Sequence, residues 1–318
     1  MEQERRNMRM GIIVIFCAIV MQLASDTVVQ VFANPRVASF LIFMETGRWV
    51  RLEAAQTLPT EPEPTITTTE PPKRGVTFAP QEAEMVELSN FTDYRPDLGA
   101  LLTSPLSWDL TEGGPAVLIV HTHATESYTG IPGYRTEDEN YNMLRVGQEM
   151  KKVLEENGIG VIHDTTLHDE PSYNNAYIYA RETIEARLKE YPSIRVVLDV
   201  HRDALELSDA VQLSTSATVD GKSASQLMLV MCTDAGNRYH PYWQENLSVA
   251  LKMQVLLERN YPGICRRMQL RTERFNQDLS PAGMLVEVGA AGDTLEEALT
   301  AARAFAQCLV ELSQGTAD

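Results

Sequence analysis

The chain has few cysteines and few basic residues, and each shortage excludes a class of protein. Only four cysteines occur in 318 residues. Cys17 lies in an apolar segment near the amino terminus, and the other three are scattered at Cys232, Cys265 and Cys308. They form no disulfide framework and no CxxC metal site, so we expect buried packing residues, although one pair could bridge in an oxidising compartment. Lysine and arginine number 27 against 44 acidic residues, for a formal net charge of −17. An acidic surface repels phosphates, which argues against a nucleic acid partner.

A glycine-rich phosphate loop is also missing. The tripeptide at 201–203, HRD, matches part of the kinase catalytic loop. Neither a glycine-rich loop nor a downstream DFG accompanies it, which excludes a kinase.

Long apolar runs are confined to the amino terminus. Three arginines within the first ten residues precede the apolar segment 11–24, which has the length of a signal-peptide core, whereas a bilayer span needs about 20 residues. If the apolar segment is extended to Phe32, it reaches the length of a bilayer span but includes the charged residue Asp26. We predict an uncleaved signal anchor over 1–33 with its amino terminus inside, followed by a membrane-proximal region over 34–56.

Proline, threonine and glutamate dominate from about Thr57 onward. Proline removes backbone donors, and the other two offer no apolar surface to bury, so we predict an extended, disordered linker over 57–84. Since 44% of the residues are apolar, the rest of the chain can form one sizeable domain. We place this domain at 85–318.

Within 85–318, apolar strand patterns alternate with helical patterns. Helices are expected at 140–157, ending at Gly158, at 172–191, and at 241–259, with a capping box at Thr294 and Glu297 starting another. Strands are expected at 159–162 and 227–232. Three further expected strands carry polar residues at or near their carboxyl ends. This alternation predicts a three-layer α/β domain with a mainly parallel central sheet, whose active site lies at the carboxyl ends of the strands.

One of these strands runs directly into two histidines and a carboxylate. In AVLIVHTHATESY, residues 116–128, period-two alternation puts His121 and His123 on one strand face, and Glu126 follows His123 at the HxxE spacing. Imidazole and carboxylate groups are zinc ligands, and a hydrolytic zinc site keeps one position open for water. A polar loop after a buried strand is the alternative interpretation.

Two further strands strengthen the metal hypothesis. IRVVLDV, residues 194–200, delivers His201, Arg202 and Asp203 at its carboxyl end, where a third ligand would lie. In MLVEV, residues 284–288, the carboxylate of Glu287 interrupts an apolar strand, where an unpartnered charge is costly. We interpret Glu287 as a general base, the alternative being a strand-end carboxylate paired with an arginine.

These motifs carry a family resemblance. HTHATESY, the run from SYNNAYIYA to VVLDVHRDA, HPYWQENL, RFNQDLS and MLVEVGAAGDTLEEA are similar to the stage II sporulation protein P family of endospore-forming bacteria. The resemblance implies an amidase-like zinc peptidoglycan hydrolase, both N-acetylmuramoyl-L-alanine amidase and endopeptidase, acting in engulfment. It also implies a single-pass membrane protein with an extracytoplasmic catalytic domain, working with sporulation proteins D and M. The metal ligands it implies are His123, Glu126 and His201, and the catalytic acid/base is Glu287.

The residues leave several alternatives open. His121 remains a possible ligand in place of His123. A zinc carboxypeptidase would need an arginine to grip a terminal carboxylate, for which Arg271 and Arg274 are available. A non-catalytic wall-binding or assembly protein is a third possibility. Ligation by His163 or His168 is less expected than a loop role, and the following residues have both substrate-lining and structural interpretations: His240, Asn276 and Gln277.

Overall fold

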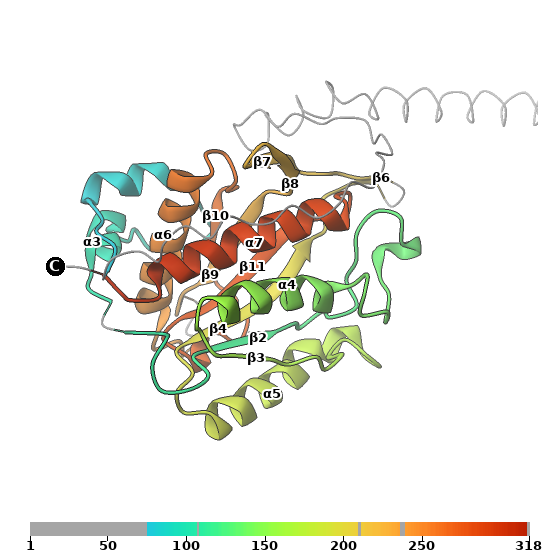
Figure 1. The fold of residues 1–318 in the computed structure, drawn as a ribbon, viewed down its shortest axis with the longest axis horizontal. Helices are drawn as coiled ribbons and strands as arrows, with labels where there is room; N and C mark the ends of the chain where they lie inside the picture. Colours follow the sequence, from blue (N-terminus) through green and yellow to red (C-terminus); the bar gives the residue numbers. More distant parts are fainter. Residues whose placement is uncertain (1–74, 107, 209–210, 236–238, 317–318) are drawn as a thin grey trace, which may run out of the picture. The chain divides into compact units, whose positions relative to one another are not determined.

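A seven-stranded sheet forms the centre of the computed structural model, which describes residues 75–106, 108–208, 211–235 and 239–316 (Figure 1). Its strand order is β1-β10-β9-β11-β4-β2-β3. The strands span Leu88–Asn90 (β1), Val117–Val120 (β2), Val161–His163 (β3), Val196–Asp203 (β4), Leu227–Cys232 (β9), Met268–Arg271 (β10) and Gly283–Ala290 (β11).

The sheet consists of two parallel blocks. Strands β11, β4, β2 and β3 run in one direction, and β9, β10 and β1 run in the other. The blocks meet at β11 and β9, which pair antiparallel. The predicted mainly parallel sheet is therefore confirmed. The alternation of strands and helices in the sequence did not indicate that a second block runs in the opposite direction.

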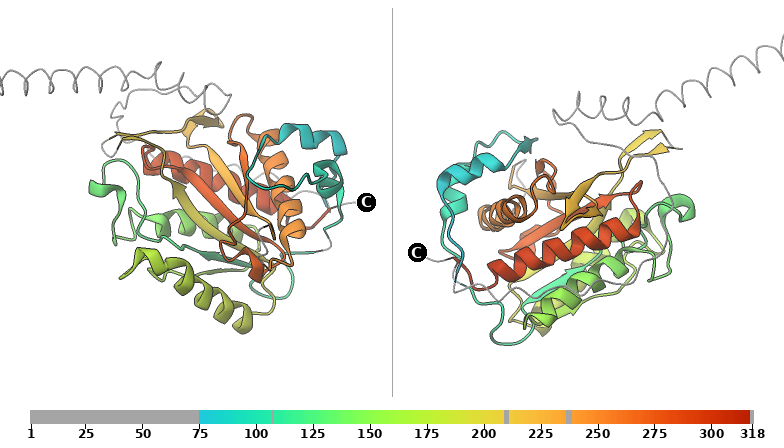
Figure 2. Two further views of the ribbon diagram at one scale, coloured as in Figure 1. Left: turned by 180° about the vertical axis from the view of Figure 1, so that it is seen from behind. Right: turned by 45° about the horizontal axis from the view of Figure 1, so that its top comes forward.

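Helices cover both faces of the sheet, so the predicted layers are present. Helices α4, α6 and α7 lie on one face and α5 lies on the other (Figure 2). The helices are α3 (Leu98–Thr103), α4 (Met143–Glu156), α5 (Ala176–Glu190), α6 (Trp243–Asn260) and α7 (Leu295–Leu312). Short 3-10 helices are η1 (Pro80–Met85), η2 (Pro132–Tyr134), η3 (Tyr173–Asn175) and η4 (Gln277–Leu279), and the small hairpins are β5 (Glu206–Ser208) with β6 (Val211–Gln212) and β7 (Ala217–Val219) with β8 (Lys222–Ala224).

Side-chain alternation along the strands divides the core between the two faces. In β2, Val117 and Ile119 join the large core beneath α4, α6 and α7, while Leu118 and Val120 pack with Ile184 of α5. All five are almost fully buried, and each such side chain contributes about 1.5 to 3 kcal/mol. This division determines which strand residues can meet on the α5 face.

Local signals in the sequence fix the helix ends. Asn142 caps α4 through a bond from the Leu144 amide, and Gly158 follows the helix with φ of 81°. The predicted capping box of α7 is present, with Thr294 accepting from the Glu297 amide while Glu297 accepts from the Thr294 amide. Cys232, Cys265 and Cys308 are buried, as a packing role predicts.

The predicted anchor and membrane-proximal region lie outside the described residues. Within the described part of the chain, no helix is both long and apolar enough to cross a membrane. Residues 75–84, which the sequence places in the linker, already belong to the fold. Val76 pairs with Thr316 in an isolated bridge, and Glu82 of η1 forms an ion pair with Arg259 of α6.

Candidate metal and catalytic site

The carboxyl ends of β2, β4 and β11 bring the predicted site residues together. His123 and Glu126 lie in the loop that follows β2, and His201 and Glu287 are register neighbours on β4 and β11. By strand alternation, His201 and Glu287 both face the α5 side. The rings of His123 and His201 have centroids 5.5 Å apart.

His201 lies between two carboxylates. Its Nε2 is 2.9 Å from Oδ1 of Asp199, and its Nδ1 is 3.5 Å from Oε2 of Glu126. Burial opposes a charged imidazole, but the two carboxylates outweigh it and hold the pKa of His201 well above its ordinary value. The contact with Asp199 is an ion pair rather than a well-aligned hydrogen bond, since Nε2 of His201 has no hydrogen-bond partner in the described part of the chain. The carboxylate still orients the ring so that Nδ1 faces Glu126.

Asp199 is held in turn by Thr122. The Thr122 amide and hydroxyl donate to its two carboxylate oxygens over 2.8 and 2.6 Å. Burial alone would raise the pKa of Asp199, but His201 and these hydrogen bonds lower it to about 2. Asp199 therefore stays ionised behind His201.

Arg202 holds Glu126 rather than facing the site. Its amide donates to Oε2 of Glu126 over 3.2 Å, and its Nη1 lies 3.8 Å from Oε1. The rest of its guanidinium donates to the carbonyls of Ser127 and Tyr134. Its donors are thereby directed into the loop after β2.

His123 is enclosed by aromatic rings. Tyr173 stacks on it with a centroid separation of 4.0 Å, and Tyr177 meets it edge-on. Arg135 lies over the Tyr173 ring and bonds to Asp169 and Thr125. The Nδ1 atom of His123 is shielded from solvent and has no hydrogen-bond partner in the described part of the chain. A buried, unpaired nitrogen is costly, and a ligand at this position would relieve that cost.

Glu287 is an unpaired carboxylate beside this cluster. The residue is partly open to solvent, but its Oε2 is shielded and has no hydrogen-bond partner among the described residues. Burial raises the pKa of Glu287 to about 8, with Asp203 and Glu126 acting in the same direction and His201 against them. No arginine forms a salt bridge with it in the described ranges, so the alternative of an arginine-paired carboxylate has no support.

His121 lies apart from this cluster, on the α4 side. Its Nδ1 is 2.9 Å from the Val200 carbonyl, its Nε2 is 2.9 Å from Nε2 of His163, and it packs against Gly147 of α4. The expectation that His121 and His123 share a strand face is wrong, because β2 ends at Val120 and the chain turns after it. Both ring nitrogens of His121 are thus occupied within the core.

His123, Glu126 and His201 supply the nitrogen and oxygen donors that zinc prefers. Across residues 75–316, leaving aside the undescribed gaps, no group of three or more His, Cys, Asp or Glu side chains lies in a metal-holding arrangement. The fit therefore rests on the chemistry of the donors and on the unpaired Nδ1 of His123.

A model of the family described as Stage II sporulation protein P (SpoIIP) matches residues 52–310. The chain belongs to this family. It is 28% identical over 212 residues to the Stage II sporulation protein P of Bacillus subtilis (strain 168), a stretch that covers 62% of this chain and 50% of the relative. This family member thus spans about half the length of the curated relative that it matches.

Two solved structures show a distant likeness to this SpoIIP family member. The N-acetylmuramoyl-L-alanine amidase AmiC2 of Nostoc punctiforme has a TM-score of 0.41 at 15% identity, over 64% of this chain and 99% of that one. The CwlD amidase from Clostridioides difficile, in complex with the GerS lipoprotein, has a TM-score of 0.40 at 15% identity, over 62% and 95%.

The other polar residues singled out in this SpoIIP family sequence are mostly structural. His168 bonds to the His121 carbonyl and to Thr183, and Gln277 bonds to the main chain of both Val230 and Cys232. Asn276 donates to the Tyr177 carbonyl, which ties the η4 loop to α5. His240 is buried, and neither ring nitrogen has a partner among the described residues.

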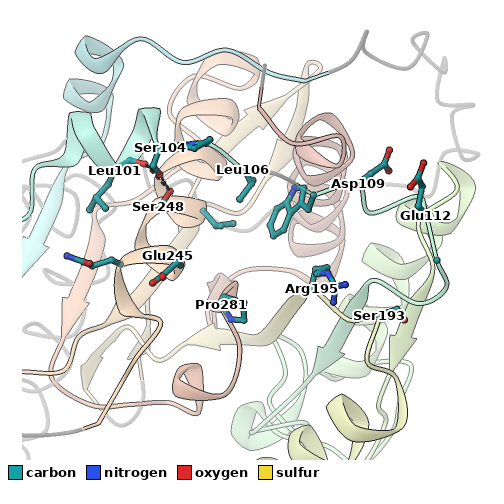
Figure 3. A pocket seen from close by; sticks show the side chains of 15 residues that line it. Leu101, Ser104, Leu106, Asp109, Glu112, Ser193, Arg195, Glu245, Ser248 and Pro281 are labelled. Carbon is teal, nitrogen blue, oxygen red and sulfur yellow. Dashed lines mark hydrogen bonds between the residues drawn. The ribbon is translucent and has the colours of Figure 1, made fainter. Parts of the chain in front are cut away.

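A cavity of about 760 Å³ lies away from these residues (Figure 3). Its lining includes Gly113, Arg195 and Pro281, which precede β2, β4 and β11 respectively. The cavity is therefore at the amino ends of the strands, opposite the edge that carries His201 and Glu287. Ser104 and Ser248 form a hydrogen bond of 2.8 Å in its wall.

Behind this wall, Lys252 is fully buried without a carboxylate partner among the described residues. Its Nζ bonds to Ser248 and the Leu101 carbonyl, and burial lowers the pKa of Lys252 to about 8. The folded protein must therefore carry a buried ammonium below pH 8, and this penalty disappears as the pH rises from about 8 to about 10.5.

We predict that Lys252→Met gains stability relative to the wild type at pH 7, because Ser104 and Ser248 still satisfy the Leu101 carbonyl. This relative gain should shrink by about 3 kcal/mol between pH 7 and pH 10.5. Urea unfolding at both pH values measures it. Lys152→Met, at an exposed position of α4, is the matched control and should show no such change. A constant difference for Lys252→Met would contradict the prediction.

Proposed function

We propose that this chain is a zinc-dependent peptidoglycan hydrolase of sporulation engulfment. It cleaves the amide between N-acetylmuramic acid and L-alanine and also acts as an endopeptidase on peptide cross-links. The observation that carries the proposal is the convergence of His123, Glu126 and His201 beside Glu287 at one edge of the sheet. Membership of the family supports the biological setting.

In the proposed site, His123, Glu126 and His201 hold the metal. The buried Nδ1 of His123 lacks another partner, and the Nδ1 of His201 already faces Glu126 while Asp199 lies behind the ring. A zinc ion bound there would polarise the scissile carbonyl and bring the pKa of the attacking water toward neutrality. Asp199 and Arg202 keep the His201 ring and the Glu126 carboxylate in place.

Glu287 performs the proton transfers. It takes a proton from the attacking water and returns it to the leaving nitrogen of the amide. Its position on β11 next to His201 puts it within the same cluster, and its lack of another partner leaves its oxygens available. Tyr173 and Tyr177 line the α5 side of the site, where their rings limit the access of bulk water to the metal ligands.

The carboxypeptidase alternative receives less support. Arg271 bonds to Glu273 and Gln269, and Arg274 lies 3.7 Å from Asp278. Arg271 ends β10, a strand of the block that runs opposite to β11, and so lies toward the edge away from Glu287. A wall-binding role without catalysis would leave the unpaired Glu287 carboxylate unexplained.

We further propose that the anchor at 1–33 holds the protein in the membrane, with the catalytic domain outside the cytoplasm. There it works with sporulation proteins D and M. The arginines before the apolar segment support this orientation. Protease treatment of intact cells should remove residues beyond Thr57 and leave the anchor in the membrane fraction. Recovery of a mature soluble protein that begins near Asn34 would indicate a cleaved signal instead.

The function is tested by incubating the full-length protein with purified sacculi, with and without a chelator. Mass spectra of the products should contain stem peptides with a free L-alanine amino group and shorter cross-linked species, and chelation should suppress both. Release of only terminal D-amino acids would favour a carboxypeptidase, and binding without any product would favour the non-catalytic role.

A further inference from the structure

Asp203 and Arg266 form an ion pair at the catalytic edge of the sheet. Nη1 of Arg266 donates to Oδ2 of Asp203 over 2.7 Å, and the two side chains are 18% and 21% exposed. Asp203 ends β4, two residues after His201, while Arg266 lies just before β10. The pair is therefore reachable from solvent, unlike the buried Asp199.

The strand order puts this pair next to Glu287. Two strands, β9 and β11, lie between β10 and β4. The Arg266 amide donates to the Leu227 carbonyl, and Leu227 is the register partner of Val288, which follows Glu287. To reach Asp203, the Arg266 side chain must pass over the end of β11. The charges of both residues act on Glu287, in agreement with this geometry.

Arg266 is a cation of the site with donors that remain available. Asp203 is the sole acceptor that its guanidinium contacts in the described part of the chain, and a guanidinium has five N–H donors. Arg202 is 8% exposed and its donors are taken by Glu126 and two carbonyls. Arg135, another partly exposed cation beside the cluster, lies over the Tyr173 ring and is already paired with Asp169. An anionic part of a substrate would be repelled by the acidic groups of the cluster, Glu126, Asp199 and Glu287.

We propose that Arg266, oriented by Asp203, is the specificity residue that binds a carboxylate of the stem peptide beside the scissile bond. This inference rests on the proposed function and names the part of the substrate that the site recognises. The fork of the guanidinium can hold two carboxylates at once, one from Asp203 and one from the substrate. In peptidoglycan, the residue after L-alanine carries an α-carboxyl that is either free or converted to a carboxamide. Arg266 selects the free acid.

The test compares two synthetic substrates, N-acetylmuramoyl-L-alanyl-D-glutamate and the same compound with its α-carboxyl converted to a carboxamide. With full-length protein, kcat/KM should be higher for the acid. Arg266→Gln should lower kcat/KM for the acid about 10- to 100-fold, chiefly through KM, and bring the ratio of acid to amide close to one. Arg266→Lys keeps the charge but loses the fork, and should give an intermediate ratio.

Arg267→Gln is the matched control, since Arg267 is the next residue and pairs with Glu87 of the neighbouring segment over 2.8 Å. It should keep the wild-type ratio. An equal loss on both substrates in Arg266→Gln would show a merely structural role, and a wild type without preference would equally overturn the proposal. Failure of the wild type to cleave either compound or sacculi would instead reject the proposed function, and this inference with it.

Discussion

Glu287→Gln is expected to fold, to bind zinc and to adsorb to peptidoglycan like the wild type, but to hydrolyse amide and peptide bonds about 10² to 10⁴ times more slowly. Glutamine keeps the size of the side chain and removes its basicity. Since Glu287 forms no salt bridge or hydrogen bond through Oε2 in the described residues, little stability should be lost. Product release from sacculi, metal content and thermal unfolding measure the three properties.

Glu296→Gln controls for the loss of one carboxylate, because Glu296 is exposed in the first turn of α7. It should retain full activity. Loss of zinc in Glu287→Gln would make Glu287 a metal ligand. Near-normal turnover would leave Glu287 structural and direct the search for a base to Asp203.

His201→Ala should lose most of its bound metal and all measurable activity. Two remaining protein ligands hold zinc poorly, and the substitution also leaves the buried carboxylates of Glu126 and Asp199 without the group between them. Metal analysis of the purified variant and hydrolysis of sacculi measure the outcome.

His121→Ala separates loss of a ligand from loss of a buried histidine. His121 lies two residues before His123 and is buried, with both ring nitrogens bonded inside the core. The variant should therefore keep stoichiometric zinc despite reduced stability. Full metal content in His201→Ala, or its loss in His121→Ala with the fold intact, would reject the ligand assignment.

The sequence predicted the strands that carry the site because each is an apolar run long enough to be recognised. It could not predict the second parallel block, since β1 and β10 are short and the direction of a strand depends on the connections around it. The face occupied by His121 was mispredicted for a related reason. Period two holds only while the strand continues, and the composition of residues 121–123 does not mark its end at Val120.

Asp199 could have been found by the logic applied to Glu287. It is a carboxylate inside an apolar strand, and it is on the same face as His201 two residues later. Tyr173 and Arg266 had no comparable signal. Tyr173 reaches His123 through the 3-10 turn before α5, and Arg266 reaches Asp203 across two intervening strands, so both contacts arise only from tertiary packing.

Anomalous diffraction at the zinc edge, from crystals grown with zinc, locates the metal relative to the three proposed ligands. We expect one strong peak within about 2.0 to 2.2 Å of a nitrogen of His123, an oxygen of Glu126 and Nδ1 of His201, with Glu287 outside the coordination sphere. A peak on other residues, such as His240 and Asp278, or the absence of any peak at saturating zinc, would contradict the ligand assignment.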